Sequence, residues 1–400
     1  MNIDEVVTQR DYLNYSKHVH AYSNAIGRLI ELSYSYIADA EAAHRAGKPA
    51  IWANGFWETP LVYACGVVPV SFAEMGRLSD KEAMEIAENY YQFPVETCSM
   101  VKCVVGQWHL RRGTSIKRIL GASGACEPFN LSWEIMKQEG YEVYNIDVTY
   151  RSPGTEGKRF DQLREFFREE LFGVVEWLTG SRDLDEERLR LEIERKNRLI
   201  RKVKRVLELR LSHPFYMKSL PTILLLNIGL TNYFGKPEEF EDVVDELLRE
   251  LTNRPVDEKE QARVIPLVWA GGTGQEFGVY EAIDQAGGSL LGLRTVPFKL
   301  YREDVPPIDS LVNFLYDNQN GGAAIHSREI IETEIEKVNA RGLVLYGYIG
   351  CSFASVDREM WRNYFHQKGI PSINLEGSYQ TGAPTGQLMT RVNAFIEMLS

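Results

Sequence analysis

The sequence lacks an apolar run long enough to cross a membrane. Its best candidate, residues 220–230, falls well short of the roughly 20 apolar residues that a spanning helix needs, and Pro221, Asn227 and Gly229 interrupt it. The opening residues, Met-Asn-Ile-Asp-Glu, also lack the basic and apolar regions of a signal peptide. We therefore expect a cytoplasmic protein that does not associate with a membrane.

An excess of basic charge is also missing. The chain has 45 lysines and arginines against 56 aspartates and glutamates, so its formal net charge is −11. A chain of this sign repels phosphate backbones, and nucleic-acid binding is not expected. The seven histidines are scattered without a zinc-type pair beside acids. We expect His18 and His20 to lie on the surface of an N-terminal helix.

Cysteine is scarce, with only Cys65, Cys98, Cys103, Cys126 and Cys351 in 400 residues. An odd and sparse set in a cytoplasmic protein argues against a disulfide framework. No compact ferredoxin-type run is present, so an iron–sulfur cluster would have to be assembled from distant segments. Cys65 lies within an apolar run and is predicted to be buried filler.

A length of 400 residues exceeds what one hydrophobic core usually serves, which favours two domains. Residues 1–45 carry apolar side chains at helical spacing. Strand-like residues 116–120 and 141–148 flank a helical pattern over 131–139, and this β-α-β order implies a parallel sheet. Four strand-like segments alternate with helical patterns in the second half: 262–269, 289–295, 343–349 and 372–375.

Residues 183–211 predict a long, highly charged helix with Asp183 as its N-cap. Its narrow apolar stripe, which includes Leu191, Leu199 and Val203, suits a connector between domains. The predicted fold is α/β, with doubly wound parallel sheets. Its units are a helical segment, a first α/β domain, a connecting helix and a second α/β domain, over residues 1–45, 46–182, 183–212 and 213–400.

Cys126 and Cys351 both fall just after predicted strands, follow small residues and begin helical segments. Doubly wound folds build their sites at the carboxyl ends of strands, and a helix N-terminus favours thiolate over thiol. Thiolates are the ligands of iron–sulfur clusters. Spacing alone leaves a second interpretation open, because free cysteines are also commonly buried as small apolar residues.

Two loops are further candidate ligand-binding sites. Residues 271–278 form a glycine-rich turn after a strand and before a helix, as a phosphate loop would. The dinucleotide fingerprint fails at Phe277 and no Walker lysine follows, so we interpret the segment as a tight turn lining a cleft. The polar residues 317–322 are interpreted as a turn, with a place near substrate as the alternative.

Several sequence blocks follow one another in a fixed order. The first block is residues 61–70, with Ala64, Gly66 and Pro69, and Cys98 follows it. The next two blocks are Cys126 with Trp133-Glu134, and Cys351-Ser352-Phe353 with Met360 and Arg362. The last block consists of residues 369–371, Glu376 and 386–397. In this order and spacing the blocks resemble the 2-hydroxyacyl-CoA dehydratase D-component family over nearly the whole chain. That family includes 2-hydroxyglutaryl-CoA dehydratase subunits and subunits of ATP-dependent benzoyl-CoA reductase.

The resemblance implies two flavodoxin-like domains and a 4Fe–4S cluster on Cys98, Cys126 and Cys351, with one iron open to another ligand. It also implies a related subunit as homo- or heterodimeric partner. A separate ATP-dependent activator, itself an iron–sulfur protein, would supply one electron at low potential. The implied reaction reduces the thioester of a 2-hydroxyacyl-CoA to a ketyl radical, which expels the 2-hydroxyl group. No catalytic side chain is assigned.

The chain departs from the family pattern in two places. Many members have a glutamate six residues before the glycine that matches Gly66, whereas this chain has Pro60 there and Glu58 as the nearest acid. Cys103 is additional, and it could replace a ligand, belong to a double-cubane cluster or be inert. Three functions therefore stay open: a dehydratase subunit, a benzoyl-CoA reductase-type or double-cubane reductase subunit, and a non-catalytic partner of the same fold.

Overall fold

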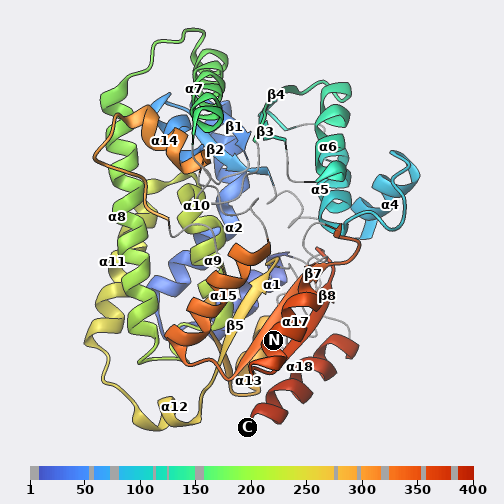
Figure 1. Ribbon diagram of the computed structural model, residues 1–400, viewed down its shortest axis with the longest axis vertical. Helices are drawn as coiled ribbons and strands as arrows, with labels where there is room; N and C mark the ends of the chain where they lie inside the picture. Colours follow the sequence, from blue (N-terminus) through green and yellow to red (C-terminus); the bar gives the residue numbers. More distant parts are fainter. Residues whose placement is uncertain are drawn as a thin grey trace.

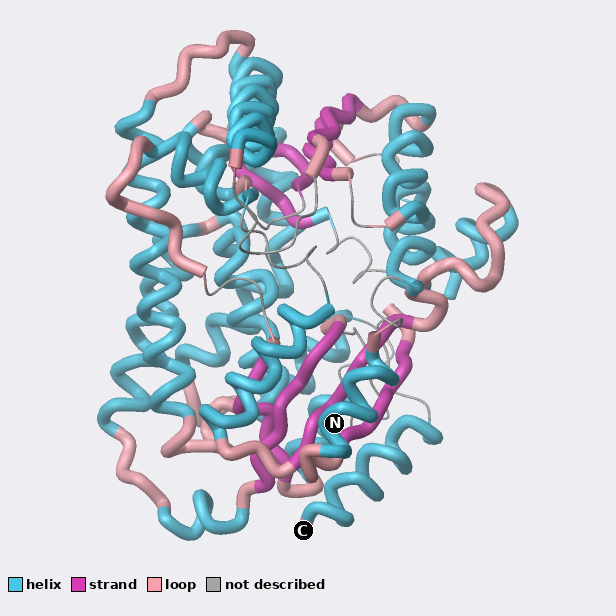
Figure 2. The backbone as a smooth tube through the Cα atoms, in the orientation of Figure 1, coloured by secondary structure: helices cyan, strands magenta, loops and turns pink. Residues whose placement is uncertain are grey.

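The structure is a computed structural model, and two parallel β-sheets organise it (Figures 1 and 2). Each sheet has four strands, in the orders β2-β1-β3-β4 and β6-β5-β7-β8, and every strand pair is parallel. Both orders match the flavodoxin-like arrangement, so the predicted fold class is confirmed. The described residues are 9–53, 58–72, 81–110, 114–123, 126–148, 157–273, 278–294, 299–316, 324–352, 357–379 and 386–400.

The first sheet consists of short strands. In chain order its elements are β1 (Ala50–Ala53), α3 (Thr59–Ala64), β2 (Val68–Ser71), α4 (Lys81–Asn89), α5 (Ser99–Leu110), β3 (Arg118–Ala122), α6 (Glu127–Gln138), β4 (Glu142–Ile146) and α7 (Lys158–Thr179). Ile51 and Ala53 pack with α3 and α7, whereas Trp52 packs with α5 and α6. This alternation places one layer of helices on each face of the sheet.

The second sheet has longer strands. Its elements are α12 (Glu258–Arg263), β5 (Ile265–Gly271), α13 (Gly278–Gln285), β6 (Gly288–Leu293), α14 (Pro307–Tyr316), α15 (Ala324–Val338), β7 (Gly342–Tyr348), α17 (Arg358–Gln367), β8 (Ser372–Gly377) and α18 (Gly386–Leu399). Val268 and Ala270 face α15 and α17, while Leu267 and Trp269 face α13 and α18. The strand predicted to begin at residue 262 begins at Ile265, because Asp257 caps a separate short helix, α12.

Helices from the N-terminus and from the middle of the chain join the two sheets. The N-terminal helices α1 (Gln9–Val19) and α2 (Asn24–Arg45) precede the first sheet, but α2 packs on α9 (Ser219–Leu224) and α11 (Pro237–Asn253). A π-helical turn, Leu225–Gly229, then α10 (Leu230–Asn232) and a 3-10 turn, Tyr233–Gly235, connect α9 to α11. One hydrophobic cluster therefore contains Trp52 of the first sheet and Trp269 of the second.

Helix α14 belongs to the second half of the chain but packs beside the first sheet. It follows β6 of the second sheet, yet it packs on α7 and α8 beside the first sheet (Figure 1). Ile308 and Leu311 of α14 belong to the same core cluster as Ile51 of β1 and Phe167 of α7. The physical reason is that α3 and α7 leave apolar surface that only a further amphipathic helix covers.

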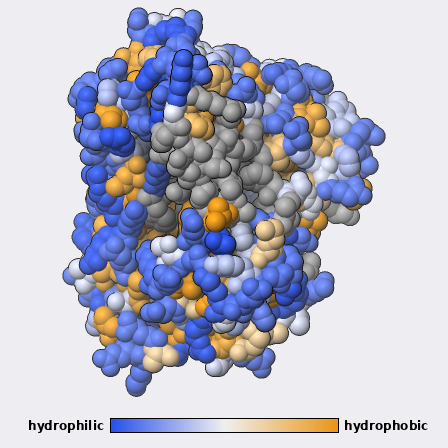
Figure 3. All heavy atoms as spheres, in the orientation of Figure 1, coloured by the Kyte–Doolittle hydropathy of each residue, from blue (hydrophilic) through white to orange (hydrophobic). Residues whose placement is uncertain are grey.

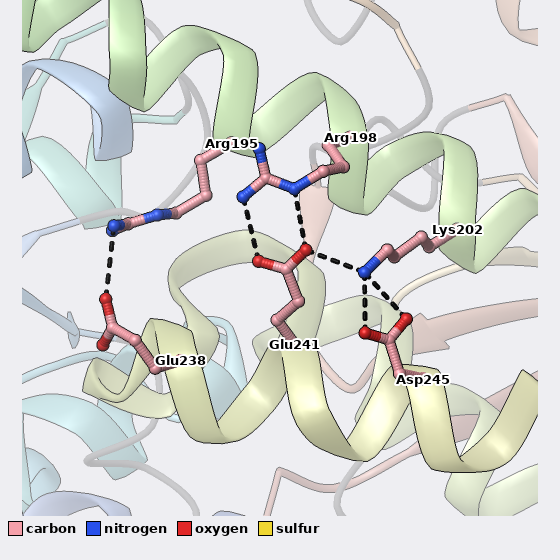
Figure 4. Close-up of polar contacts among 6 residues, drawn as sticks. All are labelled: Arg195, Arg198, Lys202, Glu238, Glu241 and Asp245. Atoms are coloured by element: carbon pink, nitrogen blue, oxygen red, sulfur yellow. Dashed lines mark hydrogen bonds and ion pairs between the residues drawn. The ribbon is translucent and has the colours of Figure 1, made fainter.

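The long connecting helix is α8, Glu186–Arg210, and Asp185 is its N-cap, accepting a hydrogen bond from the Arg188 N–H. The prediction of Asp183 as N-cap is wrong, because its carboxylate accepts the Ser181 hydroxyl in the preceding turn. Leu191, expected in the apolar stripe, is 54% exposed, and Leu189 and Ile193 are buried instead. Four ion pairs tie α8 to α11, joining Arg195 to Glu238, Arg198 to Glu241, and Lys202 to Glu241 and Asp245 (Figure 4).

His20 is not on the surface as predicted. Helix α1 ends at Val19, and the His20 ring lies in a buried turn where its Nδ1 is 3.3 Å from the Tyr22 hydroxyl. Burial lowers the pKa of His20 to about 3, so the ring is neutral. No helix in the described part of the chain is long and apolar enough to span a membrane. The face seen in Figure 3 is mainly hydrophilic, with hydrophobic residues scattered over it.

Candidate functional site

Cys126 lies at the carboxyl edge of the first sheet. Strand β3 ends at Ala122, and Cys126 is the N-cap of α6 with extended backbone angles, φ −161° and ψ 158°. Burial raises the pKa of the Cys126 thiol, and the Phe129 N–H in the first turn of α6 acts in the opposite direction. The third and smaller influence is the charge of Cys351, which raises the pKa further. The expected position at a strand end and a helix start is therefore what the structure has.

Cys98 reaches the same region from the crossover between β2 and β3. It directly precedes α5 and is buried. A hydrogen bond with the Cys351 thiol, followed by burial, raises the pKa of Cys98 far above its ordinary value. The N–H groups of Val101 and Met100 lower it, as free donors at a helix N-terminus do. Cys98 and Cys351 are thus in direct side-chain contact across the two sheets.

Cys351 comes from the second sheet through a tight turn. Strand β7 ends at Tyr348, and the Cys351 N–H donates to the Tyr348 carbonyl at 3.0 Å. Gly350 has φ +74°, and a Cβ there would lie 2.3 Å from the Glu96 carbonyl oxygen. The Ser99 N–H also donates to the Ile349 carbonyl at 2.9 Å. Only glycine at residue 350 allows the two segments to approach this closely.

The three thiols form one electrostatic group drawn from both sheets. The pKa shifts of Cys98 and Cys126 oppose ionisation, because burial and the neighbouring Cys351 sulfur disfavour a thiolate. A bound cation reverses this balance, since a coordinating thiol is deprotonated outright. In the described ranges no three metal-ligating side chains converge tightly enough for a single ion. An iron–sulfur cluster differs in this respect, because each cysteine binds a different iron.

The family assignment agrees with this arrangement. A family model described as 2-hydroxyglutaryl-CoA dehydratase, D-component, matches residues 56–399. The chain belongs to this family. No functionally curated protein matches the sequence. The matched region contains all five cysteines, and helices α1 and α2 and strand β1 precede it. The protein is thus a subunit of the 2-hydroxyacyl-CoA dehydratase type.

The other two cysteines of this dehydratase-family chain belong to helices α5 and α3 beside the first sheet. Cys103 is fully buried within α5, the helix that Cys98 directly precedes. Cys65 ends α3 and is partly buried, and burial raises the pKa of its thiol to about 11 while Arg188 acts in the opposite direction. Its prediction as filler agrees with its packing against the core that includes α3 and α7.

Pro60, at the position of the family glutamate, and the nearby Glu58 lie at the start of α3. Pro60 is buried in the first turn of α3, and Glu58 is the N-cap of that helix, only 1% exposed. The charge of Glu58 raises the pKa of Lys196, although burial outweighs it and lowers that pKa to about 7. Lys196 in turn donates to the Thr231 carbonyl at 2.8 Å. A buried carboxylate therefore does follow β1, and its charge acts on Lys196 of α8.

The glycine-rich turn after β5 serves strand packing. A Cβ at Gly271 would lie 1.9 Å from the Tyr346 carbonyl oxygen, and one at Gly272 would lie 2.7 Å from the Tyr348 ring. These glycines therefore let β5 and β7 approach each other, in agreement with the interpretation as a tight turn. Residues 274–277 of that turn, Phe353 of the third block and the polar segment 317–322 lie outside the described residues.

Two buried cations that the sequence did not predict, Lys102 of α5 and Arg358 of α17, bind neighbouring segments. Lys102 is 3% exposed and donates to Glu88 and to the Val95 carbonyl, both at 2.7 Å. Arg358 donates to the Leu375 carbonyl at 2.8 Å and pairs with Glu376. A lysine inside the apolar run of α5 was the available sequence signal for the first, since a buried lysine needs a partner.

Proposed function

We propose that this chain is the iron–sulfur subunit of a 2-hydroxyacyl-CoA dehydratase, with a 4Fe–4S cluster held by Cys98, Cys126 and Cys351. The observation that supports it most is the side-chain contact between Cys98 and Cys351, which brings a helix start of the first sheet onto the turn after β7. Cys126, beyond the end of β3, also interacts electrostatically with Cys351. Three thiols drawn from both sheets, two of them at helix starts, are in a chain of this family the donor set that such a cluster needs.

When bound, a three-cysteine cluster supplies low-potential electron transfer and one iron open to an exchangeable ligand. The residues of this chain have separate roles in that site. The N–H groups of Met100, Val101 and Phe129 stabilise negative charge on the sulfurs of Cys98 and Cys126. Gly350 lets the third cysteine meet the first, and the Lys102–Glu88 pair fixes the chain that leads into Cys98.

The proposed overall reaction is loss of water from a 2-hydroxyacyl-CoA: one electron would reduce the thioester to a ketyl radical, hydroxide would leave from C2, a proton would leave from C3, and the electron would return to the enzyme when the unsaturated product forms. The electron comes from a separate ATP-dependent activator protein. Gly271 and Gly272 of the glycine-rich turn are occupied in strand packing, which favours placing ATP hydrolysis on another protein. A related subunit, either a second copy or a sister chain, completes the enzyme, as the family name "D-component" suggests.

Iron content tests this proposal directly. Anaerobically purified protein should contain about four irons per chain and absorb broadly in the visible range. Replacing Cys98, Cys126 or Cys351 singly by Ala should remove most of the iron, whereas Cys65→Ala should keep it. A fully loaded Cys351→Ala protein would show that the assignment is wrong.

Turnover tests the reaction class. A panel of 2-hydroxyacyl-CoA thioesters, with the partner subunit present, should be dehydrated only under anaerobic conditions and only with activator and ATP. Equal rates in air, or full rates without activator, would contradict the radical mechanism. Reduction of an aromatic acyl-CoA in the same assay would identify the benzoyl-CoA reductase-type alternative, and a second cluster requiring Cys103 would identify the double-cubane alternative.

A non-catalytic role is the second candidate, and Pro60 is the observation that favours it. Where many family members have a glutamate, this chain has a buried proline in the first turn of α3. A subunit that only binds or shapes its companion would be purified without iron and colourless. Iron loading together with activator-dependent turnover would exclude this role.

A further inference from the structure

Within the described residues Arg210 and Arg358 are buried and Arg294 is partly buried, and the three differ in how their donors are satisfied. Arg210 uses all three nitrogens, donating to the Met217 and Leu290 carbonyls and to the Ser289 hydroxyl. Arg358 uses two, and its charge is paired with Glu376. Arg294 uses one nitrogen only, Nη2, which donates to the neutral Ser327 hydroxyl at 2.6 Å.

The remaining donors of Arg294 have no protein acceptor within the described ranges. Its Nε is buried without a hydrogen-bond partner. No carboxylate of those ranges lies within ion-pair distance, although the charge of Asp357 partly offsets the burial that lowers the pKa of the guanidinium. A guanidinium stays charged in a protein, so a buried one without a carboxylate partner is costly. Such a group calls for an explanation by a missing anion or water.

Arg294 lies where α/β folds bind ligands. It directly follows β6, and its N–H donates to the Trp269 carbonyl at 3.0 Å, so it sits at the carboxyl edge of the second sheet. Its guanidinium carbon is 5.6 Å from the ring centre of Trp361 in α17, and Ser327 is in the first turns of α15. The side chain is only partly covered, so a ligand can reach it.

We propose that Arg294 and Ser327 bind an oxyanion of the acyl-CoA, either a phosphate of the CoA part or a carboxylate of the acyl part. This inference rests on the proposed function for its ligand class. The guanidinium supplies charge and several N–H donors, and the Ser327 hydroxyl keeps its own proton to donate, because it accepts from Arg294. The starts of α15 and α17 at the same edge add partial positive charge.

The position also suits a ligand whose reacting end lies at the cysteines. Asp357, the carboxylate whose charge reaches Arg294, lies in the connection between β7 and α17, as Cys351 does. The pantetheine arm of CoA separates its phosphates from the thioester. An anion at Arg294 would therefore hold one end of the substrate while the other end extends along the sheet edge toward Cys351.

Equilibrium dialysis of the anaerobically purified full chain tests the site without turnover. The probes are CoA, 3′-dephospho-CoA and a free 2-hydroxycarboxylic acid. Arg294→Ala should weaken binding of the recognised probe by about tenfold or more, as the loss of one charge-assisted contact predicts. Arg294→Lys should recover only part of the affinity, and Ser327→Ala should lose less than Arg294→Ala. The matched control is Arg341→Ala, which removes the same charge at the exposed amino edge of the second sheet.

The probes separate the two anion sources. A loss for CoA but not for the free acid assigns a phosphate, and the reverse assigns an acyl carboxylate. If Arg294→Ala fails to fold, Arg294→Lys and Ser327→Ala carry the test. Wild-type affinity in all three variants, or no binding of any probe by the wild-type protein, would overturn the inference. Iron content stays a separate measurement, so an iron-free protein that still binds CoA through Arg294 would contradict only the proposed function.

Discussion

The two sheets share one strand order but are not equivalent. In each sheet, the third strand in chain order leads to a cysteine at its carboxyl edge. These are Cys126 after β3 and Cys351 after β7. The strands of the first sheet have four or five residues and those of the second have six or seven. A repeated topology therefore supplies two cysteines at corresponding positions.

The crossovers before those strands differ more. Between β2 and β3 the chain carries Cys98 at the start of α5, whereas between β6 and β7 it carries Arg294, α14 and Ser327. The first crossover thus completes a thiol site, and the second builds the proposed anion site and also sends α14 to the other sheet. The comparison teaches that topology sets where a site can form, while the crossovers decide its chemistry.

Gly350→Ala is the strongest way to break the link between the sheets. The new Cβ would meet the Glu96 carbonyl oxygen at 2.3 Å, and φ +74° is unfavourable for alanine. We expect a loss of about 4 kcal/mol in the free energy of unfolding, since left-handed strain and overpacking each cost roughly 1–3 kcal/mol. Denaturant unfolding measures this loss, and iron content should fall with it.

Gly369→Ala is the matched control for this change. Gly369 has nearly the same angle, φ +76°, but a Cβ there meets nothing within 4 Å. It should cost only about 1 kcal/mol of left-handed strain and leave the iron content unchanged. Equal losses for the two variants would mean that the close approach at Gly350 is unimportant.

Leu311→Ala tests whether α14 belongs to the first sheet. Leu311 is fully buried in the core that contains α7 and β1, so its truncation should cost about 3 kcal/mol. Hydrogen exchange should accelerate mainly in α7 and α8. The comparison variant is Ile331→Ala, an equally buried residue of α15, which should affect the second sheet instead. Faster exchange of the second sheet alone in Leu311→Ala would contradict the packing.

Glu241→Gln probes the helical side of the molecule, where α8 and α11 are paired. Hydrogen bonds from Arg198 and Lys202 lower the pKa of Glu241 to about 2. A depressed carboxylate stabilises the fold above its unfolded pKa of 4.5, and this contribution disappears as the pH falls toward 2. The partners are partly exposed, so we expect only about 1 kcal/mol at pH 7.

The difference in unfolding free energy between wild type and Glu241→Gln should shrink as the pH falls below 4.5. Glu187→Gln is the control, since its ion pair with Arg190 is exposed and lies within one helix. A difference that stays constant down to pH 2 would show that the network contributes through packing rather than through charge.

The sequence predicted elements with a strong pattern and missed those with a weak one. The strand predicted over 343–349 is observed over Gly342–Tyr348, a shift of one residue. Strand β1 was missed, because Ala-Ile-Trp-Ala is only four residues long and buried on both faces, which leaves no alternation to detect. The placement of α14 was also beyond reach, since an amphipathic pattern does not say which core it covers.

The candidate cysteine site was likewise predicted only where the sequence pattern is strong. Cys126 and Cys351 could be placed at strand ends because parallel strands have a predictable carboxyl edge. The contact of Cys98 with Cys351 depends on a turn at Gly350 and on the docking of α5, which are tertiary features. Arg294 was predicted to be part of a strand over 289–295. In the structure β6 ends at Leu293, so Arg294 lies just beyond the strand, at the edge of the sheet. Whether the three cysteines bind iron remains a prediction.

Helix α14 also matters for the protein while it is still being made. The ribosome completes β4 and α7 long before it reaches Pro307–Tyr316. Until α14 emerges, buried positions of α7 such as Leu171 and Val174 lack part of their cover. Exposed apolar surface on an unfinished chain attracts chaperones and promotes aggregation. We therefore expect chains that end before residue 307 to aggregate more readily than the full chain, even though every strand of the first sheet is already present.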